Sequence, residues 1–254
     1  MEKVPLISYG DMLPRIDRVT CGTVYPLSVA QGIQPGDIYA TETAALFWHH
    51  SGFAFLFGAC DDDFLRRVYE NFLSPDSVTA RRFILFATNP KVTRFFEDKE
   101  NLVSGKRYFF VYPNHVPPPC GRLSAHLKTQ EISRELFGKI QGSVTPRFSW
   151  ADASSFLDRG KGYCITDGNT VAAWAFSAAM SAEEIDIGVE TRAEYRRLGL
   201  GTVAAGQMIQ YCLERHKRPV WACSANNVAS RKLAEKTGFV KTAECDTFKK
   251  SDFQ

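Results

Sequence analysis

Short apolar runs alternate with amphipathic segments over the first part of the chain. Residues 53–59 form a compact apolar run that predicts a buried strand, and residues 82–87 and 108–112 predict two more. The stretch 61–73 opens with consecutive aspartates and then repeats apolar residues at helical spacing, so it predicts a capped helix. A second helix is expected over residues 89–96. Strands that alternate with helices in this way indicate a small α/β layer with parallel pairing.

The strongest break in the pattern is a run of prolines. Pro117, Pro118 and Pro119 cannot occupy a helix interior or a central strand, and they favour a stiff extended connector. We therefore predict a domain boundary there, with residues 1–115 forming an N-terminal α/β domain and residues 121–254 forming a second domain. The first domain shows no catalytic signature, so its role stays open. No internal repeat is visible in the sequence.

The pattern after the connector predicts a mixed domain. Asp167-Gly168-Asn169 is a strong hairpin-turn signal between two apolar runs. Residues 202–215 place apolar side chains on one helical stripe. Residues 228–237 predict a helix with Asn226 and Asn227 as cap candidates and Gly238 at its end. The other expected elements are helices over residues 132–140 and 153–157, a short strand after residue 239, and strands over residues 123–127, 162–166, 171–179, 183–191 and 219–224.

Composition places the chain among ordinary globular proteins. Of its 254 residues, 44% are hydrophobic and 23% are charged, and a net charge of +3 is weak for a nucleic-acid binder. The seven cysteines are odd in number, widely spaced and without a CxxC pair, which is typical of a reducing compartment. The N-terminus lacks a secretory apolar core, and the most apolar stretch, residues 53–60, is too short to span a membrane. We therefore expect a cytoplasmic protein with no nucleic-acid or membrane partner.

The segment that carries chemistry lies between residues 183 and 239. Its centre is Arg196-Arg197-Leu198-Gly199-Leu200-Gly201-Thr202, which links a predicted strand to an amphipathic helix. The two glycines allow a ligand to approach the backbone closely, and the helix start offers free N–H groups and a positive dipole end. The arginines add donors suited to phosphate. This arrangement predicts a phosphate cradle, whereas a glycine pair alone would be as typical of an ordinary tight strand–helix turn.

Several linked motifs in this segment resemble the Gcn5-related N-acetyltransferase (GNAT) superfamily. Arg196, Gly199 and Gly201 match the Gln/Arg-x-x-Gly-x-Gly/Ala motif that binds pyrophosphate in that family. Downstream, Asn227-x-x-Ser230-x-x-Leu233-x-x-Lys236-x-Gly238-Phe239 is similar to the family's Asn-x-x-Ala-x-x-Leu-Tyr-x-x-x-Gly-Phe signature. The resemblance implies that residues 121–254 form a GNAT domain, a mixed, mostly antiparallel sheet flanked by helices, preceded by the smaller α/β domain. The two-part layout is similar to a GNAT group that includes antibiotic-acetylating proteins.

The resemblance also implies a reaction and its ligands. It implies acetyl-CoA as the cosubstrate, a primary amine on a small molecule or a protein as the acceptor, and no metal. The backbone of Val189, Glu190 and Thr191 would pair with the pantetheine arm, and one N–H there would polarise the acetyl carbonyl. Asn227 would contact the coenzyme beyond the next strand. The pyrophosphate would be held by Arg196, Arg197, Leu198, Gly199, Leu200, Gly201 and Thr202.

Two positions depart from the family pattern. Many members have a tyrosine directly after the leucine that corresponds to Leu233, as the acid that protonates the leaving thiolate, but this chain has Ala234. Some members use a glutamate in the strand that corresponds to residues 221–224, which contains no acidic residue. Direct attack by a neutral amine in a ternary complex needs neither group, but it does need a route for the amine proton.

Glu184 and Asp186 are the candidate bases for that proton. Alternate residues of a strand share a face, so both carboxylates lie on one face of the strand expected over residues 183–191. A central strand covered on both sides should be nearly all apolar, so this face is expected to meet a cavity. A desolvated carboxylate has a raised pKa and can accept a proton. The alternative is that both side chains are solvent-exposed at a hairpin start.

Other candidates have simpler structural explanations. His49 and His50 point to opposite faces of a strand and have no third metal ligand near them in sequence, so structural or surface roles are expected. Cys223 has no histidine placed to activate it and is expected in the core. Core positions are likewise expected for Trp150, Trp174 and Trp221. Trp174 is also a candidate for the wall of a substrate pocket.

The sequence therefore predicts an acetyl-CoA-dependent N-acetyltransferase, and two alternatives stay open. One is a coenzyme-A-binding sensor or interaction module without turnover, which the absent acid at Ala234 favours. The other is an acyltransferase that uses another acyl chain or acceptor. Turnover with any amine would separate the first alternative from the enzyme. The residues around the acyl end would decide the second.

Overall fold

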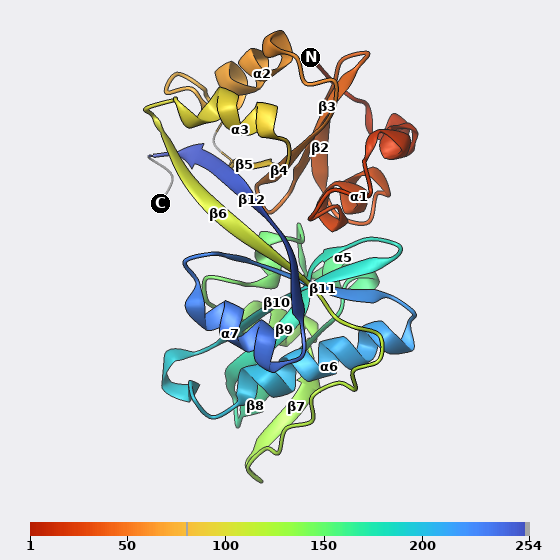
Figure 1. The fold of residues 1–254 in the computed structure, drawn as a ribbon. Helices are drawn as coiled ribbons and strands as arrows, with labels where there is room; N and C mark the ends of the chain where they lie inside the picture. The colour runs from red at the N-terminus through yellow and green to blue at the C-terminus, as the bar shows by residue number, and fades with distance from the viewer. Residues whose placement is uncertain (80, 252–254) are drawn as a thin grey trace. The chain divides into compact units, whose positions relative to one another are not determined.

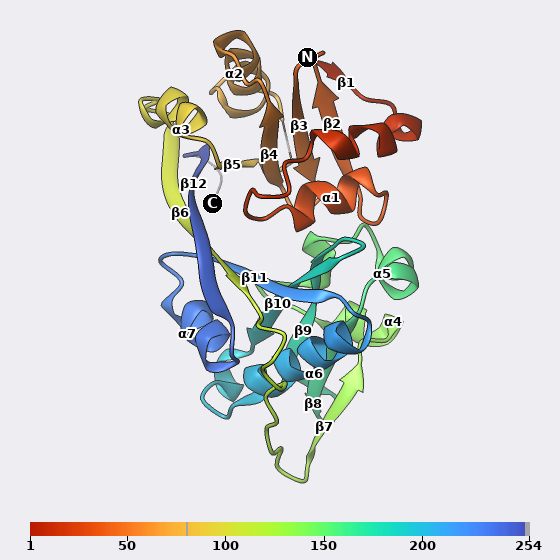
Figure 2. The ribbon, with the colours of Figure 1, turned by 45° about the vertical axis from the view of Figure 1, so that its right-hand side comes forward.

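The computed structural model describes residues 1–79 and 81–251 (Figures 1 and 2). Contacts divide the chain into two compact units, neither of which is contiguous in sequence. Unit 1 comprises Met1–Tyr108, Ser224–Asn226 and residues 243–251, and unit 2 comprises Phe109–Cys223 and Asn227–Thr242. Both units are mixed α/β structures in which helices flank a mostly antiparallel sheet. The predicted division of the sequence at the prolines stays a prediction.

The sheet of unit 1 begins as an antiparallel meander and then takes one parallel step. Its elements are β1 (Glu2–Lys3), α1 (Val24–Ala30), β2 (Gly36–Ala40), β3 (Ala44–His49), β4 (Phe53–Gly58), α2 (Asp62–Val68), β5 (Ile84–Ala87), α3 (Pro90–Glu97), β6 (Leu102–Val111) and β12 (Val240–Lys250). Strands β2, β3 and β4 pair antiparallel, β4 and β5 pair in parallel, and β12 pairs antiparallel with β5. The last residues of β6 and the first of β12 belong to unit 2.

Local signals account for the helices of unit 1, and aromatic packing accounts for its core. Asp61 caps α2 and Asn89 caps α3, because each side chain accepts a backbone N–H bond from the first helical turn. One face of the sheet buries an apolar cluster in which the rings of Phe72 and Phe83 stack with centroids 4.8 Å apart. The predicted strands and helices of this part of the chain are therefore found. The expected parallel pairing holds for β4 with β5 but does not extend to β6, because β12 lies between β5 and β6.

Unit 2 has the same kind of sheet, with strands in the order β11-β10-β9-β8-β7. Strands β10 and β11 pair in parallel, and the other pairs are antiparallel. Helix α6 packs on β8, β9 and β10. The elements are β7 (Leu127–Glu131), α4 (Arg134–Lys139), α5 (Ala153–Arg159), β8 (Gly162–Asp167), β9 (Thr170–Met180), β10 (Glu184–Thr191), α6 (Leu200–Glu214), β11 (Arg218–Ser224) and α7 (Val228–Lys236).

The turns of unit 2 follow from single residues. Gly168 has a φ of 53° in the turn between β8 and β9, a left-handed conformation that glycine adopts readily. The Asn227 side chain caps α7 by accepting the Ser230 N–H, and Gly238, with a φ of 101°, ends that helix. The hairpin and the boundaries of α7 are thus confirmed.

The two units repeat the same order of elements, although no repeat is visible in the sequence. The order α1-β2-β3-β4-α2-β5-α3-β6 in unit 1 corresponds to α5-β8-β9-β10-α6-β11-α7-β12. In each unit the third strand of the meander pairs in parallel with the strand that follows the next helix. A repeat of topology needs only similar patterns of apolar and polar positions, so residue identities can diverge until the sequence no longer shows it.

Three strands differ from the prediction. The expected strand over residues 123–127 is wrong, because β7 runs over Leu127–Glu131 at the sheet edge, where all but its first residue are exposed. An edge strand exposed in this way has no apolar run to reveal it. Strand β6 spans 10 residues and β12 spans 11, both longer than expected. Their polar residues are held by ladder hydrogen bonds rather than by burial alone.

Candidate functional site

A fork opens in the sheet of unit 2 between β10 and β11. The two strands pair in parallel only from Glu184 to Asp186 on β10 and from Arg218 to Val220 on β11. Beyond these positions β10 stays paired with β9 as far as Thr191, while its pairing with β11 ends. The last residues of β10 therefore present backbone N–H and C=O groups on the side of the fork, where an extended ligand can pair with them.

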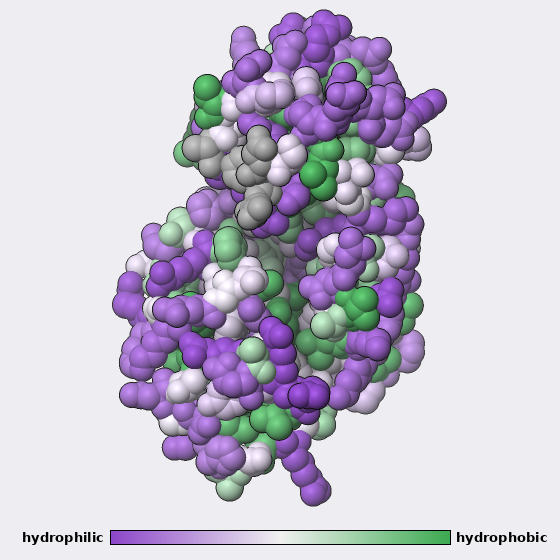
Figure 3. Space-filling model, turned by 90° about the vertical axis from the view of Figure 1, so that its left-hand side faces the viewer, coloured by the Kyte–Doolittle hydropathy of each residue, from purple (hydrophilic) through white to green (hydrophobic). Residues whose placement is uncertain are grey.

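A cleft of about 640 Å³ lies at this fork. Its lining comes from the end of β10, the loop that follows, the first turn of α6, Trp221 of β11, and α7. Figure 3 shows a hollow in this face of unit 2, with apolar side chains inside it and hydrophilic side chains around its rim. Leu198, which is 61% exposed, is not part of the lining. The predicted coenzyme residues that do line the cleft are Val189, Glu190, Thr191, Arg196, Arg197, Gly199, Leu200, Gly201, Thr202 and Asn227.

The loop before α6 is bent by two left-handed residues. Arg197 has a φ of 66° and Gly199 a φ of 78°. Glycine adopts this conformation without strain, whereas for arginine it costs on the order of 1 kcal/mol or more. Residues in such conformations turn successive N–H groups toward one side, which creates a concave site for an anion. Arg197 and Gly199 therefore shape a concave turn in the lining of the cleft.

The first turn of α6 leaves backbone donors without helical partners. The N–H groups of Thr202 and Val203 donate to the Gly199 carbonyl oxygen, at 3.0 and 3.3 Å. The preceding N–H groups, those of Leu200 and Gly201, have no carbonyl one turn earlier in the helix to accept them. Both residues line the cleft. The helix start thus offers donors and a positive dipole end to an anionic ligand.

Gly201 allows the start of α6 to pack closely between the end of β10 and α7. A Cβ atom at this position would lie 3.1 Å from the Thr191 Oγ1 atom and 3.3 Å from the Leu233 Cδ2 atom. These contacts are tighter than ordinary van der Waals contacts, and they lie between the end of β10 and α7. Gly201 consequently keeps the first turn of α6 close to two other residues of the cleft lining.

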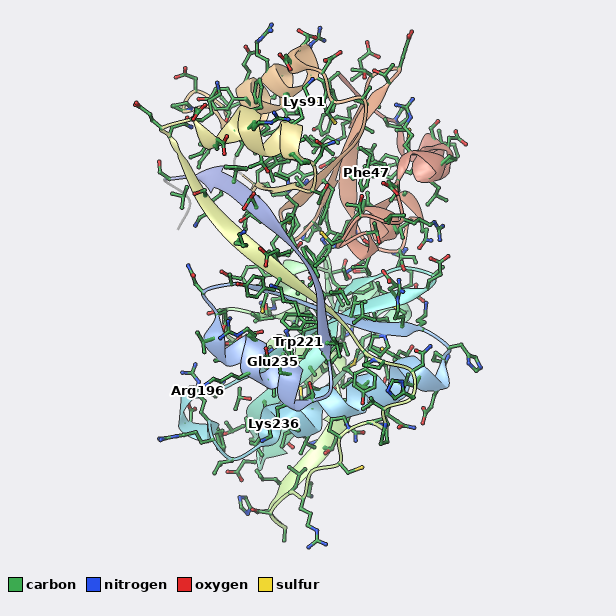
Figure 4. The ribbon with its side chains drawn as sticks, in the orientation of Figure 1. Phe47, Lys91, Arg196, Trp221, Glu235 and Lys236 are labelled. Carbon is green, nitrogen blue, oxygen red and sulfur yellow. The ribbon has the colours of Figure 1, made fainter. Side chains whose placement is uncertain are left out.

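Charge is distributed unevenly along the cleft. The cationic lining residues are Arg196 and Arg197 of the loop and Lys232 and Lys236 of α7. Among the described residues that line the cleft, Glu190 is the single carboxylate. Figure 4 shows Trp221 near the middle of unit 2 beside α7, and Arg196 toward its periphery. A ligand with several phosphates fits the cationic part, and a cation fits the part near Glu190.

Trp221 and Ser230 join β11 to α7 within the cleft. The Trp221 Nε1–H group donates to the Ser230 Oγ atom at 3.0 Å, and both residues belong to the lining. The Trp221 side chain is buried, as predicted, yet the expectation that it serves only the core is incomplete, because it also walls the cleft. The sequence signal for this hydrogen bond was Ser230, which stands where the family signature has alanine.

The opposite wall of the cleft is fixed by two neighbouring side chains of the sheet. Glu190 of β10 and Trp174 of β9 are register partners. The Val144 N–H group donates to the Glu190 Oε2 atom at 2.6 Å, and the Trp174 Nε1–H group donates to the Val144 carbonyl oxygen at 2.7 Å. The backbone of Val144 is therefore held by two side chains from neighbouring strands of the sheet. Sequence reasoning missed the contact because the residues are about 30 or more positions apart.

The two candidate bases are buried, which removes the alternative of solvent-exposed side chains, but neither lines the cleft. Glu184 forms an ion pair with Arg218, whose Nε atom is 2.7 Å from its Oε1 atom. That ion pair ties the Glu184 carboxylate to its register partner on the neighbouring strand. Asp186 is the last β10 residue paired with β11, so its backbone lies at the vertex of the fork. Asp186 is 3% exposed.

The remaining candidates take structural positions. His49 is buried, and its Nδ1 atom accepts the Ser51 N–H at 3.1 Å. Burial lowers the pKa of His49 to about 3, and the nearby charges of His50 and Arg81 act in the same direction. Cys223 is buried as predicted. These residues belong to the packing of their units.

The equivalent position in unit 1 has the opposite charge. Where unit 2 has arginines and glycines before α6, unit 1 has Asp61 as the cap of α2, followed by Asp62 and Asp63 in its first turn. These carboxylates already occupy the positive end of the helix dipole and repel a second anion. The repeated topology therefore does not repeat the anion site.

Two negative findings apply to residues 1–79 and 81–251. No three His, Cys, Asp or Glu side chains in this part of the chain converge into a group that could hold a metal ion. No helix there is both long enough and apolar enough to cross a bilayer.

Comparisons with known proteins cover nearly the whole chain. A family model described as GNAT acetyltransferase matches residues 22–248. A Bacillus subtilis protein named "Uncharacterized N-acetyltransferase YdfB" is 24% identical over 248 residues, which cover 93% of each chain. The match to the family begins well before the segment that carries the motifs, so it includes most of unit 1.

Solved structures show the same fold. A GCN5-related N-acetyltransferase-like protein from Streptococcus suis is similar with a TM-score of 0.75 and 24% identity, covering 97% of this chain and 100% of that one. A tandem GNAT protein from the clavulanic acid biosynthesis pathway is similar with a TM-score of 0.61 and 10% identity, covering 97% of this chain and 96% of that one. The second likeness accords with the repeated order of elements in the two units.

Proposed function

The chain belongs to the GNAT acetyltransferase family, and we propose that unit 2 transfers the acetyl group of acetyl-CoA to a primary amine by direct attack in a ternary complex. The observation that carries this proposal is the cleft, which combines free N–H groups at the start of α6, cationic side chains and a fork in the sheet. The name of the Bacillus subtilis relative supports the same class of reaction.

The residues of the cleft fit coenzyme A. The N–H groups of Leu200 and Gly201, with the arginines at 196 and 197, would hold the pyrophosphate. Lys232 and Lys236 would meet further phosphate charge. Gly201 keeps the first turn of α6 close to Thr191 and Leu233, which line the same cleft. Bound acetyl-CoA supplies a thioester carbonyl carbon that an amine can attack.

The fork would orient that thioester. The backbone of Val189, Glu190 and Thr191 would pair with the pantetheine amides, and an N–H group there would donate to the acetyl oxygen as negative charge develops on it. The arm would then run from the loop before α6 toward the vertex of the fork, beside Trp221. Asn227, which lines the same cleft and caps α7, would contact the arm on its other side.

An amine acceptor fits the charge at the other end of the cleft. Glu190 is the single carboxylate in the described lining, so it would attract an ammonium group. Once neutral, the amine nitrogen bonds to the acetyl carbon, the carbon–sulfur bond breaks with its electron pair passing to sulfur, and the nitrogen loses one proton. Asp186 is the base that we propose, directly or through a water molecule, because its backbone lies at the vertex of the fork.

Two measurements on the full chain test this function. Acetyl-CoA should raise the melting temperature, because a ligand that binds only the folded state stabilises it. Release of free thiol from acetyl-CoA should then accelerate when small primary amines or peptides with free amines are added. No thermal shift at millimolar acetyl-CoA would refute the coenzyme assignment. A shift without turnover of any amine would instead support a coenzyme-A-binding sensor.

A further inference from the structure

The departing sulfur atom develops a negative charge that the attacking amine nitrogen does not. When the carbon–sulfur bond breaks, the sulfur atom takes the electron pair and leaves as a thiolate. A hydrogen-bond donor aimed at the sulfur stabilises that charge more in the transition state than in the neutral thioester, and so accelerates the step. Ala234, where the family signature has a tyrosine, is fully buried and has no hydroxyl group. Another donor in the cleft can take this part.

Trp221 and Ser230 lie where that donor is needed. Trp221 comes directly after Val220, the last β11 residue paired with β10, so it lies at the vertex of the fork. Its indole N–H donates to the Ser230 hydroxyl at 3.0 Å, so one tryptophan side chain and one hydrogen bond link the vertex to that hydroxyl. Both residues line the cleft, and Trp221 is only 3% exposed. The Ser230 hydroxyl is consequently shielded on its Trp221 side from bulk water.

The surroundings of Ser230 make it a strong donor. Its oxygen accepts the indole N–H, and a hydroxyl that accepts one hydrogen bond donates a stronger one, because bonds in a chain polarise one another. Among residues 1–79 and 81–251, nothing accepts the hydroxyl hydrogen. Ser230 is also the third residue of α7, a helix of nine residues, and the positive end of its dipole favours a nearby anion.

We propose that the Ser230 hydroxyl donates a hydrogen bond to the coenzyme A sulfur and stabilises the departing thiolate, while Trp221 acts as the positioning residue that orients and polarises this hydroxyl. The inference rests on the proposed function. Ser230 keeps its own proton, since a serine hydroxyl is a much weaker acid than a thiol. The thiolate leaves with the electron pair of the broken bond and takes a proton from water on release.

The test measures the pKa of the coenzyme A thiol bound to the full chain, from the ultraviolet absorbance of the thiolate. Removing a charge-assisted hydrogen bond in Ser230→Ala should raise this pKa by about 1 unit or more and lower the acetyl-transfer rate roughly tenfold. Ser230→Thr keeps the hydroxyl and should restore both values. Trp221→Phe should raise the pKa by a smaller amount. The matched control is Ser143→Ala, which removes a hydroxyl from the opposite wall and should leave the pKa unchanged.

The outcomes separate this inference from the proposed function. If the parent protein does not bind coenzyme A, the proposed function itself fails. If Ser230→Ala binds coenzyme A with parental affinity and an unchanged thiol pKa, the inference is refuted and the function stands. A purely structural role for Ser230 would lower the melting temperature or the coenzyme affinity without moving the thiol pKa, and that result would also overturn it.

Discussion

Gly201 is the position at which a substitution most directly tests the phosphate cradle. Any side chain there begins with a Cβ atom 3.1 Å from the Thr191 Oγ1 atom and 3.3 Å from the Leu233 Cδ2 atom. Gly201→Glu adds a carboxylate to the same place, whereas Gly201→Gln adds the same bulk without charge. The pair separates the steric effect from the electrostatic one. Gly201 has no left-handed φ, so neither variant should strain the backbone.

The size of the charge effect follows from the geometry. For a carboxylate at this position and a phosphate held by the first turn of α6, we take a charge separation of about 6 Å. Each charge pair then repels by about 0.7 kcal/mol at the dielectric constant of water and about 3 kcal/mol at an effective value near 20. For the two phosphate charges the sum is roughly 1.5–6 kcal/mol. Gly201→Glu should therefore bind acetyl-CoA at least about tenfold more weakly than Gly201→Gln.

Calorimetric titration with coenzyme A at two salt concentrations checks this expectation. The difference between the two variants should shrink at high salt, because added ions screen exposed charges. Melting temperatures without ligand provide the control for folding, since both variants crowd Thr191 and Leu233 to the same degree. Equal affinities of the Glu and Gln variants at low salt would show that the phosphates do not lie at the start of α6.

Three further predictions concern the base, the missing acid and a buried histidine. Asp186→Asn should lower kcat/KM by roughly 10²–10⁴-fold, with the largest loss at low pH, where the amine is mostly protonated; rates within about twofold of the parent from pH 6 to 9 would remove Asp186 from the mechanism. Ala234→Tyr should lower the free energy of unfolding by about 1–3 kcal/mol without raising the rate, because Ala234 is fully buried and a larger side chain overpacks its site; a tenfold faster turnover would contradict this. His49 has a pKa of about 3 in the native state, below its value in the unfolded chain, so the unfolded chain binds the proton that the native state excludes. As the pH falls from 6 to 4, the free energy of unfolding of the parent should therefore decrease by about 1.4 kcal/mol per pH unit relative to that of His49→Asn, as measured by urea titration. Parallel pH profiles of the two proteins would refute the burial argument.

Much of the fold followed from signals that act within a few residues. The caps at Asp61, Asn89 and Asn227 were readable because each bonds a backbone N–H in the next helical turn. The turn at Gly168 was readable because its conformation suits glycine. The parallel pairing of β4 with β5 followed from the alternation of strands and helices. Edge strands such as β7 were missed, since an exposed strand has no apolar run.

The candidate site divides in the same way. The sequence by itself determined the phosphate loop, because Arg196, Gly199 and Gly201 act through their own backbone and the helix start beside them. Only the tertiary structure decided the rest: the ion pair that occupies Glu184, the Trp221–Ser230 contact, and the wall that Glu190 and Trp174 fix through Val144. Most of these contacts join residues some 30 or more positions apart, and even the shorter step from Trp221 to Ser230 passes from a strand to a helix. No local propensity encodes such pairs, because which side chains meet depends on strand register and on how each helix packs against the sheet.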